Sequence, residues 1–282
     1  MELRELGRTE FPKPLLEIPK PPEKLWLRGS LPPPDTRLLA VVGSRALTRY
    51  GREACEYLIE GLAGYPVSII SGLALGVDAC AHRAALAAGL HTIAVPGSGL
   101  SDKAIYPRTN FGLAMDILDA GGALLSEQEP GYFPHPHDFP ARNRIMVGLS
   151  HAVLVIEAAP KSGTLITARL AADYNRDLLC IPHRIGDPHA AGNLFLRLGA
   201  GLASEPAHIL EALGITAEEP AEKPLVRLGD EEQRLYELLL EPLSRDELIR
   251  RSGLPSHEVL ARAGALELKG VLKEEFGAWR RA

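Results

Sequence analysis

Five short apolar runs alternate with helical patterns along most of the chain. The runs cover residues 38–42, 67–70, 92–95, 152–156 and 178–181. Helical patterns occupy residues 50–63, 77–88, 110–120, 164–175 and 206–213, and two shorter runs, 123–126 and 201–203, are further strand candidates. Apolar strands that alternate with helices predict an α/β domain whose parallel sheet is buried on both faces.

Each of the five runs ends in a corner rich in glycine, serine or basic residues. The corners are Gly43-Ser44-Arg45, Ser71-Gly72, Gly97-Ser98-Gly99, the turn ending Lys161-Ser162-Gly163-Thr164, and Pro182-His183-Arg184. Ligands bind at the carboxyl ends of the strands in such sheets. Small residues let the backbone approach a ligand, and the N–H groups of helix N-termini favour anions. Because Arg45 and Lys161 add positive charge, the pattern predicts an anion site, with phosphate as the expected group.

Composition changes along the chain and predicts four parts. They are an N-terminal arm (1–37), the sheet domain (38–214), a linker (215–229) and a small domain (230–282). The arm is rich in proline and charge, and its one strong apolar cluster is Leu25-Trp26-Leu27. We therefore expect it to pack one short segment without a core of its own. The linker is rich in glutamate and proline, which is typical of flexible connections.

The last part shows three amphipathic stretches, at residues 231–240, 244–251 and 256–268, and a hairpin pattern around 270–276. This is the element order of a winged-helix domain, which often binds duplex DNA through its third helix. Val259, Ala263 and Leu266 are expected to face inward there, and His257, Arg262 and Lys269 outward. The part holds nine basic residues against eleven acidic ones. Duplex binding and a protein-interaction role therefore both stay open.

The whole chain has a net charge of -5, which disfavours nonspecific coating of nucleic acid but allows a local basic pocket. Cys55, Cys80 and Cys180 lack metal or redox spacing, so we expect buried reduced thiols in a cytoplasmic protein. The first thirty residues lack the apolar stretch of a signal peptide, and no apolar run approaches the roughly 18 residues of a membrane span. No membrane partner is expected.

The stretch of roughly 25 residues after Ser126 carries four prolines ahead of Arg142-Asn143-Arg144, and a loop of this length in a compact domain is usually functional. Two arginines at a predicted helix start oppose the helix dipole, which suggests an anionic ligand or a carboxylate partner. Tyr106 offers a ring for stacking.

Motifs for cofactors, metals and catalysis are incomplete. The corner after the first run lacks G-x-G-x-x-G, and the Lys161 turn lacks the full phosphate-loop spacing. His135, His137 and Asp138 do not have a metal-binding spacing. Asp78 is expected at a helix N-terminus and His82 in a structural role. We expect no cofactor, no metal and no catalytic group.

The motifs as a set resemble the DNA-processing protein A family, DprA or Smf. The matching segments are 42–45, 71–78, 96–99 with 106–107, 142–145 and 161–167, in family order over about residues 20–213. The resemblance implies an extended Rossmann-like domain with a parallel, mixed-edge sheet, and a winged-helix tail that some members carry. It also implies a homodimer without catalytic activity that binds single-stranded DNA in natural transformation, protects it and helps load the RecA recombinase. The N-terminal helical domain of many members is expected to be missing or nearly so.

The matched motifs imply a set of DNA-binding residues. They are Gly43, Ser44, Arg45, Ser71, Gly72, Gly97, Ser98, Gly99, Tyr106, Arg142, Asn143, Arg144, Lys161, Ser162, Gly163 and Thr164. Among these, Arg45, Arg142, Arg144 and Lys161 are expected to form one basic pocket.

Two alternatives stay open. The first is a nucleotide-processing enzyme resembling the phosphoribohydrolases that carry P-G-G-x-G-T-x-x-E, although Thr167 stands where their catalytic glutamate would be. The second is a nucleotide-sensing regulatory module that acts through its winged tail.

Overall fold

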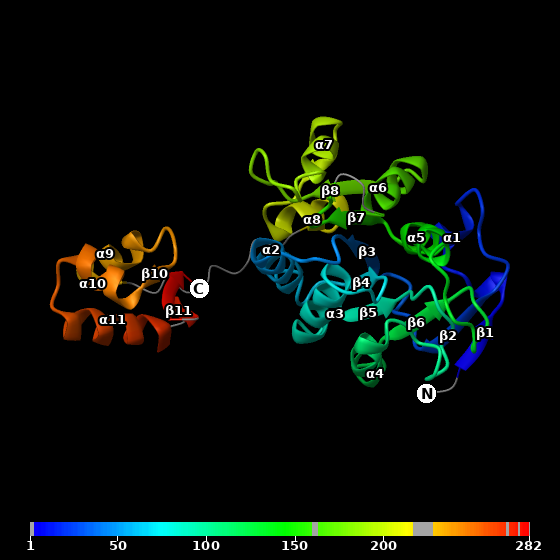
Figure 1. Ribbon diagram of the computed structural model, residues 1–282, viewed down its shortest axis with the longest axis horizontal. Helices are drawn as coiled ribbons and strands as arrows, with labels where there is room; N and C mark the ends of the chain where they lie inside the picture. The colour runs from blue at the N-terminus through cyan, green and yellow to red at the C-terminus, as the bar shows by residue number, and fades with distance from the viewer. Residues whose placement is uncertain (1–2, 160–162, 217–227, 269–270, 276, 282) are drawn as a thin grey trace. The chain divides into compact units, whose positions relative to one another are not determined.

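The computed structural model describes residues 3–159, 163–216, 228–268, 271–275 and 277–281. The chain divides into two compact units, Met1–Ala217 and Glu218–Ala282 (Figure 1). None of the helices in these described ranges is long and apolar enough to cross a membrane.

The described part of the first unit is built on one mixed sheet. Its strands are β1 (Leu3–Leu6), β2 (Leu25–Gly29), β3 (Arg37–Val42), β4 (Val67–Ser71), β5 (His91–Ala94), β6 (Ala123–Ser126), β7 (Ala152–Val155), β8 (Asp177–Cys180) and β9 (Gly201–Leu202). Their order is β1-β2-β6-β5-β4-β3-β7-β8-β9. In this order, all neighbouring strands between β6 and β9, including β5, β4 and β3, pair in parallel. At the other edge, β2 pairs antiparallel with β6, and β1 pairs antiparallel with β2. The predicted parallel sheet with a mixed edge is confirmed.

Helices cover both faces of this sheet (Figure 1). They are α1 (Lys13–Leu16), α2 (Arg49–Glu60), α3 (Val77–Ala87), α4 (Phe111–Asp119), α5 (Asp138–Leu149), α6 (Thr164–Asp173), α7 (Gly192–Arg197) and α8 (Pro206–Ala212). Alternate residues of β3 face opposite sides: Leu39 and Val41 pack with α2, α3 and α8, whereas Leu38 and Val42 belong to the core under α1, α5 and α6. Burial on both faces explains why these strands are continuous apolar runs.

The N-terminal segment differs from the predicted arm, because it is part of the main core. Strand β2 pairs with β6, and the side chains of Leu6, Leu15, Leu25 and Leu27 are buried. The expected boundary at residue 37 is therefore not a structural boundary. The sequence does not reveal that this segment belongs to the core, because its apolar residues are widely spaced among prolines and charged residues.

Helix α5 starts at Asp138, earlier than the sequence suggested. Arg142 therefore lies in the second turn, and the expected conflict of a helix-start arginine with the helix dipole does not arise. The short helix α7 has no counterpart among the predicted helices. The three cysteines are free and buried, as predicted.

The described part of the second unit contains α9 (Asp230–Leu238), β10 (Leu243–Ser244), α10 (Arg245–Ser252), α11 (Ser256–Leu268), β11 (Leu272–Glu275) and β12 (Ala278–Arg281). The strand order β10-β12-β11 completes a winged helix, as predicted. Val259, Ala263 and Leu266 are fully buried on the inner face of α11, which confirms the expected orientation of that helix.

Candidate functional site

A pocket of about 730 Å³ lies at the carboxyl ends of the central strands. From β3 the chain continues to β4, β5 and β6 on one side, and β7, β8 and β9 lie on the other. Such a reversal of strand order is where open α/β sheets bind ligands. The described lining residues are Val42, Gly43, Ser44, Arg45, Ala46, Ala74, Asp78, Tyr106, Pro136, Phe139, Pro140, Arg142, Asn143, Met146, Gly163, Thr164 and Thr167.

One wall of the pocket combines a cation with two aromatic rings. The guanidinium carbon of Arg45 lies 5.4 Å from the ring centroid of Phe139. The ring of Tyr106 lies 5.8 Å from that of Phe139, with an angle of 40° between their planes. Tyr106 is about half exposed. This wall offers ring faces for a planar group and positive charge for an anion.

Arg142 is buried at the base of the pocket, where its residue is only 8% exposed. Its guanidinium donates to the carbonyl of Val95 and occupies the space that a side chain on Gly72 would need. Burial lowers the pKa of Arg142 to about 10, although the carboxylate of Asp78 opposes this change. Arg142 is therefore charged at neutral pH. Within the described structure its buried Nε atom has no hydrogen-bond partner.

Asp78 is the acidic residue among the described lining residues, and it is already engaged. Its carboxylate accepts hydrogen bonds from the backbone N–H groups of Gly72 (3.1 Å) and Ala74 (3.3 Å). Burial raises the pKa of Asp78, whereas the Arg142 charge and these N–H groups lower it. The carboxylate therefore holds the loop after β4 in place, as expected for a partner of the α3 N-terminus.

Three helix N-termini at this edge of the sheet hold a buried carboxylate of the chain itself. Glu157 contacts Thr48 at the start of α2, Asp78 lies in the first turn of α3, and Asp138 lies in the first turn of α5. Helix α6, which begins at Thr164 beside the pocket, has no acidic residue in its first turn. Its N-terminus therefore presents positive potential that no carboxylate of that turn neutralises.

Eight of the sixteen predicted residues line the pocket: Gly43, Ser44, Arg45, Tyr106, Arg142, Asn143, Gly163 and Thr164. Lys161 and Ser162 lie outside the described residues. The remaining six do not line it, and their contacts explain why. Ser71 donates to the carbonyl of Val41, and Gly72 lies against the Arg142 guanidinium.

The Gly97-Ser98-Gly99 corner is covered by the loop before α5. Gly97 lies against Phe139, and Gly99 lies against the backbone of Glu129 and Pro130. Arg144 is paired with a carboxylate, at 2.5 Å from Glu127, so the expected group of four cations is not gathered in this pocket.

Sequence reasoning missed the pocket residues that come from the proline-rich loop and α5: Pro136, Phe139, Pro140 and Met146. The unusual length of that loop was the signal available for them. Its His135 and His137 rings stack in parallel at 5.7 Å, and the described residues include no cluster of three or more His, Cys, Asp or Glu that would hold a metal.

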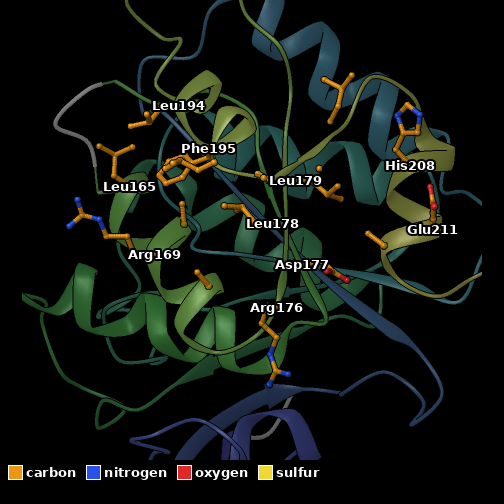
Figure 2. A pocket seen from close by; sticks show the side chains of 18 residues that line it. Leu165, Arg169, Arg176, Asp177, Leu178, Leu179, Leu194, Phe195, His208 and Glu211 are labelled. Carbon is orange, nitrogen blue, oxygen red and sulfur yellow. The ribbon is translucent and has the colours of Figure 1, made fainter.

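A second groove, of about 850 Å³, lies at the β8 and β9 edge of the sheet (Figure 2). Its lining combines apolar side chains, among them Leu178, Leu194 and Phe195, with Arg169 and Glu211 near its margins. Leu198 in this groove is 70% exposed.

Comparison with known proteins places this architecture in a family. The family of DNA recombination-mediator protein A matches residues 3–214, and the DprA winged helix domain matches residues 219–277. The chain belongs to the DprA family.

DprA relatives match over most of the chain. Protein Smf of Escherichia coli is 38% identical over 96% of this chain and 75% of its own length. DNA processing protein DprA of Streptococcus pneumoniae is 41% identical over 71% of this chain and 70% of its own length.

Two solved DprA structures share the fold. The X-ray structure of the Streptococcus pneumoniae protein superposes with a TM-score of 0.68 at 36% identity, covering 74% of each chain. A Helicobacter pylori DprA structure, described for its single-stranded DNA binding mode, gives a TM-score of 0.66 at 30% identity and covers 75% of this chain and 95% of that one.

Proposed function

We propose that this DprA-family chain binds single-stranded DNA without catalysing a reaction, and that in natural transformation it protects the strand and helps load RecA. The observation that carries the proposal is the pocket at the strand-order reversal. This pocket brings together three features. Arg45 lies over the Phe139 ring, the Nε atom of Arg142 has no hydrogen-bond partner within the described structure, and the first turn of α6 contains no acidic residue. The Helicobacter pylori relative, described as binding single-stranded DNA, supports the same ligand class.

The pocket suits the two parts of a nucleotide separately. Phosphates would bind beside Arg45 and the first N–H groups of α6, while bases would stack on the rings of Tyr106 and Phe139. Stacking on a protein ring requires a base that is not stacked in a duplex, so single strands are favoured. Few lining side chains suit base edges, and binding is therefore largely indifferent to sequence.

The residues around Thr167 favour binding over hydrolysis. The Thr167 hydroxyl accepts a hydrogen bond from the Asn143 amide at 2.9 Å and is buried. It stands at the position of the catalytic glutamate in the phosphoribohydrolase motif, and it cannot take up a proton as a carboxylate does. Asp78 is engaged by backbone N–H groups. A nucleoside monophosphate hydrolysis assay should give no product above background.

Single-strand and duplex titrations over a range of salt concentrations test the binding proposal. Counterion release predicts a slope of about -0.7 in log affinity against log salt for each neutralised phosphate. We expect single strands to bind at least about tenfold more tightly than duplexes, and unrelated sequences to compete within about a hundredfold of each other. Equal affinity for duplex and single strand would contradict the proposal.

RecA loading is tested by the rate of RecA assembly on strands already covered by a single-strand binding protein. The DprA-family chain should accelerate that assembly. An unchanged rate at saturating protein would limit the function to binding and protection.

We propose a homodimer that forms at the β8 and β9 groove. Leu194, Leu198 and Leu202 line this groove and are exposed, and exposed apolar side chains gathered in one place favour association. Light scattering should show that Leu198→Asp shifts the chain toward the monomer. Leu240→Asp is the matched control, because Leu240 is similarly exposed but lies in the winged-helix unit. A monomeric parent protein would refute the dimer.

A further inference from the structure

Glu157 is a buried carboxylate whose surroundings are shaped to hold it. It follows β7, and its residue is 1% exposed. Its Oε2 atom accepts a hydrogen bond from the Thr48 backbone N–H at 3.1 Å, and its Oε1 atom accepts one from the Thr48 hydroxyl. A side chain on Gly51 would collide with this carboxylate. Gly51 therefore leaves the space in which Glu157 lies.

These contacts place the carboxylate at the N-terminus of α2. Thr48 is the N-cap of that helix, and its hydroxyl also accepts a hydrogen bond from the Gly51 N–H at 3.0 Å. Helix α2 follows β3 at the strand-order reversal, where sheets of this class hold the phosphates of nucleotide cofactors. In this chain the position is filled by an internal anion.

We propose that Glu157 is a specificity-determining residue that keeps free phosphate and mononucleotides away from the N-terminus of α2. A second anion at the α2 N-terminus would collide with the Glu157 carboxylate and would be repelled by its negative charge. Phosphate then binds beside Arg45 and the N-terminus of α6 but not at the N-terminus of α2, and a ligand gains affinity by extending along the edge as a strand does. This inference rests on the proposed function for its ligand, but its test does not require DNA.

Two substitutions distinguish exclusion by the filled space from exclusion by the negative charge. Glu157→Ala empties the position and removes the charge, whereas Glu157→Gln removes the charge and keeps the space filled. Calorimetric titration with inorganic phosphate measures the phosphate affinity of each variant, with chloride at matched ionic strength as the reference. We expect phosphate to bind the Glu157→Ala variant about tenfold more tightly than the parent chain, which corresponds to about 1.4 kcal/mol and lies within the range of charge interactions at helix termini.

The control is Glu60→Ala, which removes an exposed carboxylate from the last turn of the same helix, far from its N-terminus. Phosphate affinity should not change in that variant. A smaller gain in Glu157→Gln than in Glu157→Ala would assign the exclusion mainly to space, and an equal gain would assign it to charge. Both results support the role of Glu157. No gain in either variant would overturn it.

Glu157→Ala leaves the Thr48 donors unpaired and therefore destabilises the fold. If it is too unstable for titration, the thermal unfolding temperature with phosphate and with chloride replaces calorimetry, since an anion that fills the vacancy stabilises the folded state by mass action. An unfolding temperature that phosphate does not raise above the effect seen in Glu60→Ala would contradict the inference. A parent chain that fails to bind single strands, together with a phosphate gain in Glu157→Ala, would refute the proposed function and leave the role of Glu157 intact.

Discussion

The two units of the chain hold their arginines in opposite settings. In the first unit, Arg45 lies over the Phe139 ring, and the buried Nε of Arg142 has no partner within the described structure. In the winged-helix unit, Arg262 of the third helix forms ion pairs with Glu231 and, at 3.0 Å, with Glu258. An outward role for this arginine was expected from sequence, and its internal partners argue against it.

An arginine without an ion-pair partner is available to an external anion, whereas one that pairs with a carboxylate of the chain is not. A guanidinium that pairs with an internal carboxylate must lose that partner before it binds a phosphate. Arg144 repeats the pattern within the first unit, because Glu127 holds it at 2.5 Å. Net charge, which sums over both kinds of arginine, does not distinguish them.

Arg142→Met should cause the largest loss of stability. It leaves the buried Asp78 carboxylate without the nearby positive charge that lowers its pKa, and an uncompensated buried charge costs about 3 kcal/mol. Urea titration, fitted separately for the two units, measures the free energy of unfolding. Arg262→Met is the matched control, and because Arg262 is partly exposed it should cost the second unit less than about 1 kcal/mol. Equal losses of unfolding free energy in Arg142→Met and Arg262→Met would contradict the difference between the two arginines.

Acid should destabilise the first unit through His82. Burial, followed by the Arg142 charge, lowers the pKa of this histidine to about 3. The unfolded chain, with a histidine pKa near 6.5, therefore binds more protons between about pH 6.5 and 3, and the stability falls as the pH falls through that window. Between pH 6.5 and 5 we expect a loss of about 1.5 kcal/mol.

The matched variant for this pH dependence is His82→Asn, which keeps a polar group near the Thr92 hydroxyl that His82 contacts at 2.8 Å. His91 and His151 also have a pKa lowered by burial, so they add to the acid dependence in the same direction. The difference between the parent and His82→Asn isolates the share of His82. Parallel stability curves for the two proteins would show that His82 does not titrate on unfolding.

Arg45→Ala should weaken single-strand binding about tenfold and flatten its salt dependence by about 0.7, the effect of one lost phosphate contact. Arg262→Ala should change neither quantity, because its internal carboxylates already hold it. Fluorescence anisotropy of a labelled oligonucleotide at several salt concentrations measures both. An Arg45→Ala variant that binds like the parent at every salt concentration would remove Arg45 from the site.

Removal of the winged-helix unit should have the smallest effect. A chain ending after Leu213 keeps every described residue of the pocket, so its single-strand affinity should stay within a factor of ten of the parent value. Light scattering establishes whether the truncated protein keeps the parent's oligomeric state. A larger loss without a change of state would mean that the second unit contributes to DNA binding.

The central strands were predictable because they are largely buried on both faces and therefore form mostly apolar runs. Strand β7, expected at 152–156, covers Ala152–Val155. The strands β1 and β2 were not predictable, since β2 pairs with β6, which lies far along the chain, and β1 joins the sheet only through β2. Leu25 and Leu27 are buried in the core on one face of the sheet, and Trp26 is partly buried against the core on the other face, but three residues alone do not establish such a pattern.

The pocket was predictable where strand ends determine it and not where loops cross it. Arg45 follows directly from its position after β3. Phe139 lies in the pocket only because the proline-rich loop folds back over Gly97, and the spacing of residues does not reveal that path. The Glu127 partner of Arg144 is likewise a tertiary contact, and its absence from the sequence pattern explains why Arg144 was grouped with Arg45.

The pairing of β2 with β6 also bears on how the chain folds during synthesis. Trp26 pairs with Ser126, so β2 has only its β1 partner until residues 123–126 have left the ribosome. Contacts between distant positions form slowly, and apolar segments that wait for them are prone to aggregate. The chain would therefore depend on chaperone protection of its first thirty residues more than on that of the winged helix, whose widest strand pairing, Leu243 with Trp279, joins positions much closer in sequence than Trp26 and Ser126.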